Sequence, residues 1–255
     1  FKAYVFVTED FGETWKAIAN NLPHPANVIR EHHRNPNLLL VGTEFGLWVS
    51  FNRGASWMQF KSNLPTVPVD DIQIHPRDND LILATHGRSI YVLDDMTALE
   101  QMTETIAAAE AHLFDIRPAT MWRQYNHKGS TGHKTFIANN PPVGTVIAYS
   151  LREKAKDKAR VTIHDKSGTL IRDLTVTNET GVQRIVWDCR YQSPLPGLSQ
   201  APNANSSFSG IGTGAFARGP RVLPGEYTAK LWLDSKEIMS KPLTVEEDPR
   251  IDLSP

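Results

Sequence analysis

The chain has 255 residues, of which 40% are apolar and 22% are charged, and its formal net charge is −1. A charge this close to zero gives no overall field that would attract nucleic acid or an anionic membrane. No apolar run reaches the roughly 20 residues that a membrane-spanning helix needs, and the single cysteine, Cys189, excludes an internal disulfide. The chain begins at Phe1 inside an apolar alternation, which we interpret as a position within a longer polypeptide.

The first hundred residues contain a repeat with a period of 42 residues. The stretch TEDFGETW at 8–15 returns as SFNRGASW at 50–57, and Asn-Leu-Pro follows each copy at the same distance. Part of a third copy follows, since NLLLVGTEFGLWVSFN at 37–52 is similar to DLILATHGRSIYVLDD at 80–95. A period of about 40 to 50 residues with short strands is typical of the blades of a β-propeller.

Short apolar segments in this region predict β-strands. Each segment has five or six residues rich in Val, Ile, Leu and aromatic side chains, and turn-forming residues separate most of them. Strands this close in sequence must pair antiparallel, because a parallel connection needs a dozen or more residues. Four such strands per period make one blade. The predicted strands are 4–8, 27–32, 38–43, 46–50, 57–61, 71–75, 81–85 and 89–93.

The repeated motif predicts a locked turn before the last strand of each blade. Asp10 can accept hydrogen bonds from backbone N–H groups two or three residues on, and Gly12 can adopt the positive φ of a tight corner. Trp15 can then place its ring between neighbouring sheets. Asn52 replaces the aspartate in the second copy, which keeps an acceptor oxygen and loses the charge. The residues assigned to this structural role are Thr8, Asp10, Gly12, Trp15, Ser50, Asn52, Gly54 and Trp57.

The pattern S/T-x-D-x-G-x-T/S-W is the Asp-box, or BNR, repeat, and residues 1–98 resemble the final blades of sialidase-like and sortilin-like propeller proteins, which are often described as glycosyl hydrolase-like. The resemblance implies an all-β fold in which 1–98 form the last two to three four-stranded blades of a propeller. A closed propeller has roughly 4 to 8 blades, so the expected partners are the remaining blades, in the same protein or in another chain. The family pattern often has Asp-Pro where this sequence has His32 and His33. These two histidines, adjacent on a strand, should point to opposite faces and cannot share a metal.

The segment 99–139 is predicted to be a helical connector followed by a crossover loop. Ala, Glu, Leu and Met give 96–114 a helical composition, whereas 116–134 is polar and irregular. The histidines at its centre, His127 and His133, are weak candidates for metal ligands, because exposed loop histidines are far more common.

Strands return over 140–250, where DKSG at 165–168 marks a hairpin turn. About six or seven strands in roughly 110 residues predict an Ig-like or fibronectin-like β-sandwich. Gly, Ser, Pro and Asn dominate 192–221, which is interpreted as a long insert that is mobile, packs against the propeller or serves as a ligand flap. Cys189 lies in a strand whose alternation predicts a buried core residue rather than a nucleophile.

Turns between the second and third strands of each blade form the candidate ligand face, together with the links between blades. In sialidase-like proteins the site lies on the face opposite the Asp-box turns, so the resemblance selects Glu44, His86 and Arg88 as candidate ligand-binding residues. An arginine offers a bidentate fork for a carboxylate. The alternative is structural, with Arg88 and Glu44 joining adjacent blades by an ion pair.

No catalytic set, metal site or cofactor motif is legible in the sequence, and no cofactor is expected. Sialidase-like hydrolysis, as the family performs it, needs an arginine cluster, a Tyr–Glu nucleophile pair and an acid gathered from many blades. The resemblance therefore implies part of a larger extracytoplasmic protein, periplasmic or secreted, that binds a glycan or peptide on the propeller face or in its channel. The alternatives are a sialidase-like glycoside hydrolase with its catalytic residues in other blades, which leaves enzymatic activity undecided, and an assembly factor for a membrane complex. The location rests on the resemblance alone.

Overall fold

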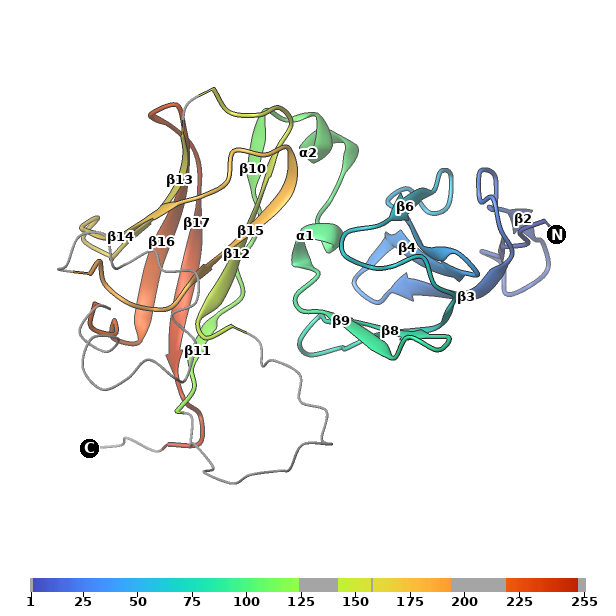
Figure 1. Ribbon diagram of the computed structural model, residues 1–255, viewed down its shortest axis with the longest axis horizontal. Helices are drawn as coiled ribbons and strands as arrows, with labels where there is room; N and C mark the ends of the chain where they lie inside the picture. Colours follow the sequence, from blue (N-terminus) through green and yellow to red (C-terminus); the bar gives the residue numbers. More distant parts are fainter. Residues whose placement is uncertain (1, 124–141, 157, 194–218, 252–255) are drawn as a thin grey trace. The chain divides into compact units, whose positions relative to one another are not determined.

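The computed structural model describes residues 2–123, 142–156, 158–193 and 219–251 (Figure 1). These residues form β-strands joined by loops, with two short helices, and the chain divides into two compact units, Phe1–Thr105 and Ile106–Pro255. The predicted all-β class is confirmed. Within the described ranges, no helix has the length and apolar character needed to cross a membrane.

The first unit contains three antiparallel sheets, and the predicted strands of 1–98 are all found with small shifts at their ends. The first sheet has two strands, the second four and the third three, each in chain order. The strands are β1 (Phe6–Val7) and β2 (Lys16–Ala17); β3 (Ala26–His32), β4 (Asn35–Thr43), β5 (Gly46–Ser50) and β6 (Met58–Phe60); and β7 (Val69–Ile74), β8 (Leu81–Thr85) and β9 (Ile90–Leu93).

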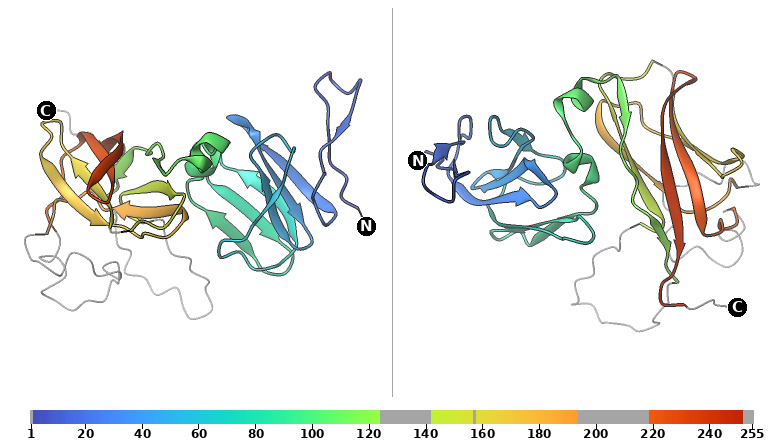
Figure 2. Two further views of the ribbon diagram at one scale, coloured as in Figure 1. Left: turned by 90° about the horizontal axis from the view of Figure 1, so that it is seen from above. Right: turned by 180° about the vertical axis from the view of Figure 1, so that it is seen from behind.

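The three sheets lie side by side in chain order (Figure 2), with an apolar core between each neighbouring pair. Strand β4 serves both cores, because successive side chains of a strand point to opposite faces. Leu38 and Leu40 pack toward the third sheet, whereas Leu39 and Val41 pack toward the first. The second sheet is therefore buried on both faces.

The 42-residue period reappears as contacts between neighbouring sheets. The Asn27 side-chain amide donates to the Val69 carbonyl at 3.4 Å, and Arg30 Nε donates to the Ile72 carbonyl at 2.8 Å. The guanidinium of Arg30 also forms an ion pair with Asp71 at 3.0 Å. These contacts join β3 to β7, so equivalent strands of successive repeats lie next to each other.

The two Asp-box tryptophans occupy different surroundings. Trp57 is 4% exposed between the first and second sheets, and its Nε1–H donates to the Ile18 carbonyl at 2.6 Å. Trp15 is 62% exposed, and its Nε1–H donates to the carbonyl of Gly12 in its own turn at 3.1 Å. The prediction that the tryptophan ring lies between neighbouring sheets therefore holds for Trp57 and not for Trp15.

His32 is fully buried in a polar network at the ends of the strands. Its Nε2 lies 2.8 Å from Asn79 Oδ1, its Nδ1 accepts the Arg34 N–H at 3.3 Å, and the Asn79 amide donates to Glu100 at 2.7 Å. The His33 ring stacks on His32 with 4.7 Å between centroids, so the prediction that the two histidines point to opposite faces is wrong. The strand ends at His32, and the alternation does not continue into the turn.

The helical connector expected over 96–114 is found in part, as two short helices, α1 (Thr97–Glu100) and α2 (Glu104–Ala108), but its last residues form a strand instead, β10 (Ala111–Leu113). Helix propensity is a weak preference, and pairing of β10 with β12 of the second unit outweighs it. The irregular segment expected at 116–134 includes β11 (Ala119–Met121), which pairs parallel with β17.

The second unit consists of two sheets that share one apolar core. Their strand orders are β10-β12-β15 and β11-β17-β16-β13-β14. Trp187 and Tyr149 fill the centre of this core, where Tyr149 donates its hydroxyl hydrogen to the Thr177 carbonyl at 2.9 Å. Burial raises the pKa of Tyr149 to about 12. The remaining strands are β12 (Thr145–Leu151), β13 (Ala159–His164), β14 (Leu170–Thr175), β15 (Gly181–Trp187), β16 (Gly225–Leu233) and β17 (Lys236–Glu247).

The paired tryptophans give a direct test of the packing between sheets. We expect Trp57→Ala to lower the free energy of unfolding by about 3–5 kcal/mol, because it empties a buried site between two sheets. Trp15→Ala is the matched control and should change it by about 0.5 kcal/mol or less, as is usual for exposed positions. Urea unfolding of the 255-residue chain measures both, and equal losses for the two variants would contradict the assignment.

The network around His32 predicts a pH dependence in the first unit. Burial, the largest cause, lowers the pKa of His32, and nearby His33 and Arg34 act in the same direction against Asn79 and Glu100. The folded chain therefore keeps His32 neutral, whereas the unfolded chain takes up a proton near pH 6.5. The free energy of unfolding should decrease as the pH falls below about 6.5.

Amide exchange at 38–41, measured at pH 7.5 and 5.5, reports this effect in the first unit. His32→Gln should make exchange at these amides less sensitive to pH once intrinsic exchange rates are corrected. His33→Gln, at the exposed neighbour, should reduce the dependence only slightly, because burial and not His33 is the largest cause of the lowered pKa of His32. An unchanged dependence in His32→Gln would assign the effect to other groups.

Candidate functional site

The turns β4–β5 and β8–β9 lie at one edge of the second and third sheets, beside the links that enter those sheets. The Phe45 ring of the first turn packs against His24 of the preceding link, with 4.3 Å between ring centroids. In the second turn the His86 N–H donates to the Pro68 carbonyl at 3.0 Å. His86 Nδ1 also lies 3.2 Å from the carboxylate of Asp70 at the start of β7. Turns and links therefore share one face of the first unit.

All three side chains predicted for this face, Glu44, His86 and Arg88, are exposed there. Among the described residues, no hydrogen bond or ion pair joins any of these three side chains to another. His86 pairs with Asp70, and no ion pair links Glu44 to Arg88 in the described part of the chain. The ion pair expected to join neighbouring sheets is instead formed by Arg30 of β3 and Asp71 of β7.

Three residues of this face were not selected from the sequence: His24, Phe45 and Asp70. The two links that contain His24 and Asp70 were expected on this side. Which side chains these two residues contact depends on the strand register. Asp70 and His86 are 16 residues apart, and only the hairpin β7–β8 brings them together. The face thus combines an exposed aromatic ring, two carboxylates, a guanidinium and two imidazoles, which are suited to binding a polar ligand.

The Asp-box side chains are used within their own turns. Asp10 Oδ1 accepts the Thr14 N–H at 2.9 Å and the Thr8 hydroxyl at 2.8 Å, while Oδ2 accepts the Thr14 hydroxyl. Hydrogen bonds, led by that from the Thr14 side chain, lower the pKa of Asp10 to about 2. The backbone N–H that Asp10 accepts belongs to Thr14, four residues later in the chain, whereas the sequence predicted a donor two or three residues later. Asn52 makes the equivalent bond to the Ser56 N–H at 2.9 Å, so the charge is not needed for the turn.

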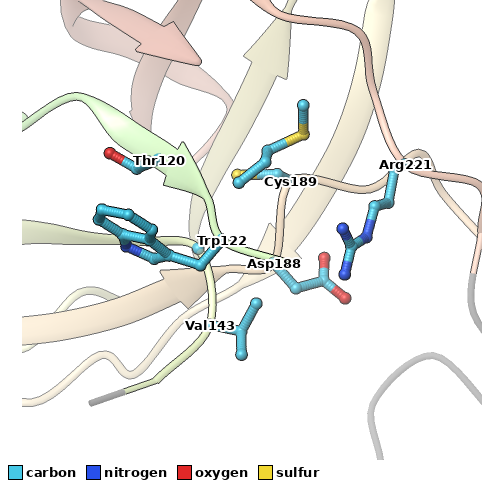
Figure 3. Close-up of a pocket in the computed structure, with 8 residues that line it drawn as sticks. Thr120, Trp122, Val143, Asp188, Cys189 and Arg221 are labelled. Carbon is cyan, nitrogen blue, oxygen red and sulfur yellow. The ribbon is translucent and has the colours of Figure 1, made fainter. Parts of the chain in front are cut away.

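The second unit contains a small shallow pocket between the end of β11, the segment before β12 and the loop after β15 (Figure 3). Trp122 and Val143 line it, together with the carboxylate of Asp188, the guanidinium of Arg221 and the thiol of Cys189. Its internal space is about that of one water molecule, which is too small for an organic ligand.

Cys189 is buried beside this pocket, as predicted, but it lies in the loop after β15 and not in a strand. Burial raises the pKa of its thiol to about 12, with a smaller contribution in the same direction from Asp188. Because the thiolate is the reactive form, this cysteine is not activated as a nucleophile. Among the described residues, no group of three His, Cys, Asp or Glu side chains is arranged to hold a metal ion. His127, His133 and most of the insert at 192–221 lie outside the described residues.

Part of the chain matches a known family. Residues 3–129 match the family model described as sortilin, neurotensin receptor 3. The vacuolar protein sorting/targeting proteins 10 of Pyrenophora teres f. teres and Pyrenophora tritici-repentis are each 23% identical to this chain over 124 residues, which is 49% of this chain. The chain spans only 8% of the length of these relatives.

A solved structure that aligns with this chain is the extracellular domain of a one-component system from B. thetaiotaomicron. It aligns with 84% of this chain and 24% of its own length, at 10% identity and a TM-score of 0.20. The family match, by contrast, covers both Asp-box turns and the whole candidate ligand face. For this part of the chain it supports the resemblance to sortilin-like Asp-box propellers.

Proposed function

We propose that residues 1–98 are successive blades of an Asp-box propeller in a larger extracytoplasmic protein, and that their turn face binds a glycan or peptide ligand. The main support for this proposal is the match of residues 3–129 to the sortilin family model. Three antiparallel sheets that stack at the period of the sequence repeat support the same proposal.

Further blades of the same protein are the partners that the first sheet requires. Tyr4, Phe6, Phe11 and Trp15 are all exposed on or beside this two-stranded sheet. Trp57, the equivalent of Trp15 one period later, shows what covers such a residue, because it packs on the preceding sheet. A preceding blade would cover Trp15 in the same way, since stacked repeats bury faces that a single repeat exposes.

For residues 140–250 we propose an Ig-like sandwich that braces or spaces the propeller. Two mainly antiparallel sheets around one core, with a buried Trp187 at the centre, support this assignment. The parallel pairing of β11 with β17 adds an edge strand to that plan. Among the described residues of this unit, no group of side chains is arranged like a catalytic site.

The ligand face itself is suited to recognition because its groups stand on turns that two packed sheets hold in place. Glu44 and Arg88 have no protein partner among the described residues, so their charges are available to a ligand. Phe45 adds an exposed ring against which a sugar or an apolar side chain can pack.

The double variant Glu44→Ala, Arg88→Ala tests this face. We expect at least a roughly tenfold loss of affinity, because two charged contacts of about 1 kcal/mol each are removed. The melting temperature should stay within about 2 °C, since neither side chain supports the fold. A glycan array and a peptide array, probed with the longest polypeptide that contains this region, would first supply the ligand for titration.

The matched control is Glu153→Ala, an exposed charge of the second unit, which should leave binding unchanged. Binding that is intact in the double variant would exclude this face. Turnover of an arrayed glycan by the longer polypeptide would instead favour a glycoside hydrolase with catalytic residues in other blades.

A further inference from the structure

We propose that the turn between β4 and β5 is a subsite for a basic side chain, so that the ligand of the turn face is a peptide with an accessible arginine or lysine. The inference rests on the proposed function, because it concerns the same face of the first unit. It goes further by naming the chemical group that one turn recognises and the residues that recognise it.

Two consecutive residues at the tip of this turn present groups that suit a cation. Phe45 is 49% exposed, and Glu44 beside it is also exposed. Among the described residues, no hydrogen bond or ion pair uses the Glu44 carboxylate. The face of an aromatic ring attracts a positive charge, and a carboxylate forms charge-assisted hydrogen bonds with an ammonium or a guanidinium. The turn therefore offers a basic side chain two favourable contacts at once.

The main chain of this turn is fixed in the absence of a ligand. The hydroxyl of the buried Thr43 donates to the Gly46 carbonyl at 3.0 Å and accepts the Phe45 N–H at 3.2 Å. Gln59 of β6 donates its side-chain amide to the Phe45 carbonyl at 3.1 Å. Both main-chain groups of Phe45 are thus bonded. A turn that is already ordered loses little conformational freedom on binding, which leaves more of the contact energy for affinity.

The Phe45 ring has one supported side and one accessible side. It packs against the ring of His24 with 4.3 Å between centroids and 46° between the ring planes. His24 itself is half-buried, whereas about half of the Phe45 surface stays open. The open part can take the flat guanidinium of an arginine or the ammonium of a lysine.

The charges on the face favour a peptide over a neutral glycan. Glu44 carries a negative charge on one turn, and Arg88 carries a positive charge on the other. The Asp70 carboxylate, by contrast, already has His86 Nδ1 at 3.2 Å. A peptide can bring a basic group to Glu44 and an acidic group to Arg88. A neutral sugar would take water from both charges without pairing either, which is unfavourable.

A pentapeptide with a single basic residue isolates the subsite. The probe is acetyl-Gly-Gly-Arg-Gly-Gly-amide, and the matched control carries citrulline, which keeps the shape of arginine and lacks its charge. Titration of the 255-residue protein into the millimolar range, followed by NMR, should shift the amide signals of residues 44–46. The citrulline probe should bind about tenfold more weakly, because the ion pair and the cation–π contact are both lost.

Three variants locate the contact. Glu44→Gln should weaken binding of the arginine probe by about five- to tenfold and remove most of its advantage over citrulline, since only the charge changes. Phe45→Leu should weaken it by about threefold, because leucine keeps the apolar bulk and has no aromatic face. Arg88→Gln should bind the arginine probe at least as tightly as the unaltered protein, because it removes a like charge.

Equal affinity for the two probes would overturn the proposal, and this comparison uses the unaltered protein, so it is independent of how the variants fold. A loss in Arg88→Gln as large as the loss in Glu44→Gln would also overturn it. Amide signals of β4 and β5 that keep their positions show that a variant is folded. Shifts at other residues, with those of 44–46 unchanged, would place the basic group elsewhere.

The array hits of the longer polypeptide separate this inference from the proposed function. Peptide hits that lose binding when their basic residue is replaced by citrulline support the subsite. Binding of neutral glycans alone, lost in the Glu44→Ala, Arg88→Ala variant, would overturn the subsite and keep the ligand face. Binding that is insensitive to that double variant would reject the face itself, and the subsite with it.

Discussion

The stacking of each sheet on its neighbour is the constraint on which the first unit depends. Strand β4 places apolar side chains on both of its faces, so the second sheet is stable only with a sheet on either side. Trp57 completes one interface by packing on the first sheet, and Arg30 completes the other by bonding to the backbone of β7. Apolar burial and a few directional bonds thus repeat at the period of the sequence.

This arrangement separates the side chains that hold the unit together from those on the proposed ligand face. The polar side chains of the Asp-box turns form hydrogen bonds within their own turns, as Asp10 does with the N–H and hydroxyl of Thr14. The turns at the other edge keep Glu44 and Arg88 out of the hydrogen-bond network. A rigid stack with uncommitted side chains on its turns is a common arrangement for recognition, and it requires no catalytic group within this segment.

The second unit is held by a different principle. Its two sheets close on one core that includes Trp187 and Tyr149, and this core is complete within the described residues of the unit. In the first unit, by contrast, the apolar residues form two separate cores, one on each face of the second sheet. The two units therefore differ in how their sheets share apolar cores.

The sequence alone determined the strands of the first unit, their antiparallel pairing and the two locked turns, because these depend on local alternation and on residues close in the chain. It also indicated the face on which Glu44, His86 and Arg88 lie. It did not determine the pairing of His86 with Asp70, the stacking of His32 on His33 or the strand at 111–113. Those features depend on register and on contacts between distant segments, which outweigh local preference. The exposure of Trp15 and the burial of Trp57 show the same distinction: the motif is repeated, and only the tertiary structure decided which copy has a neighbour to pack against.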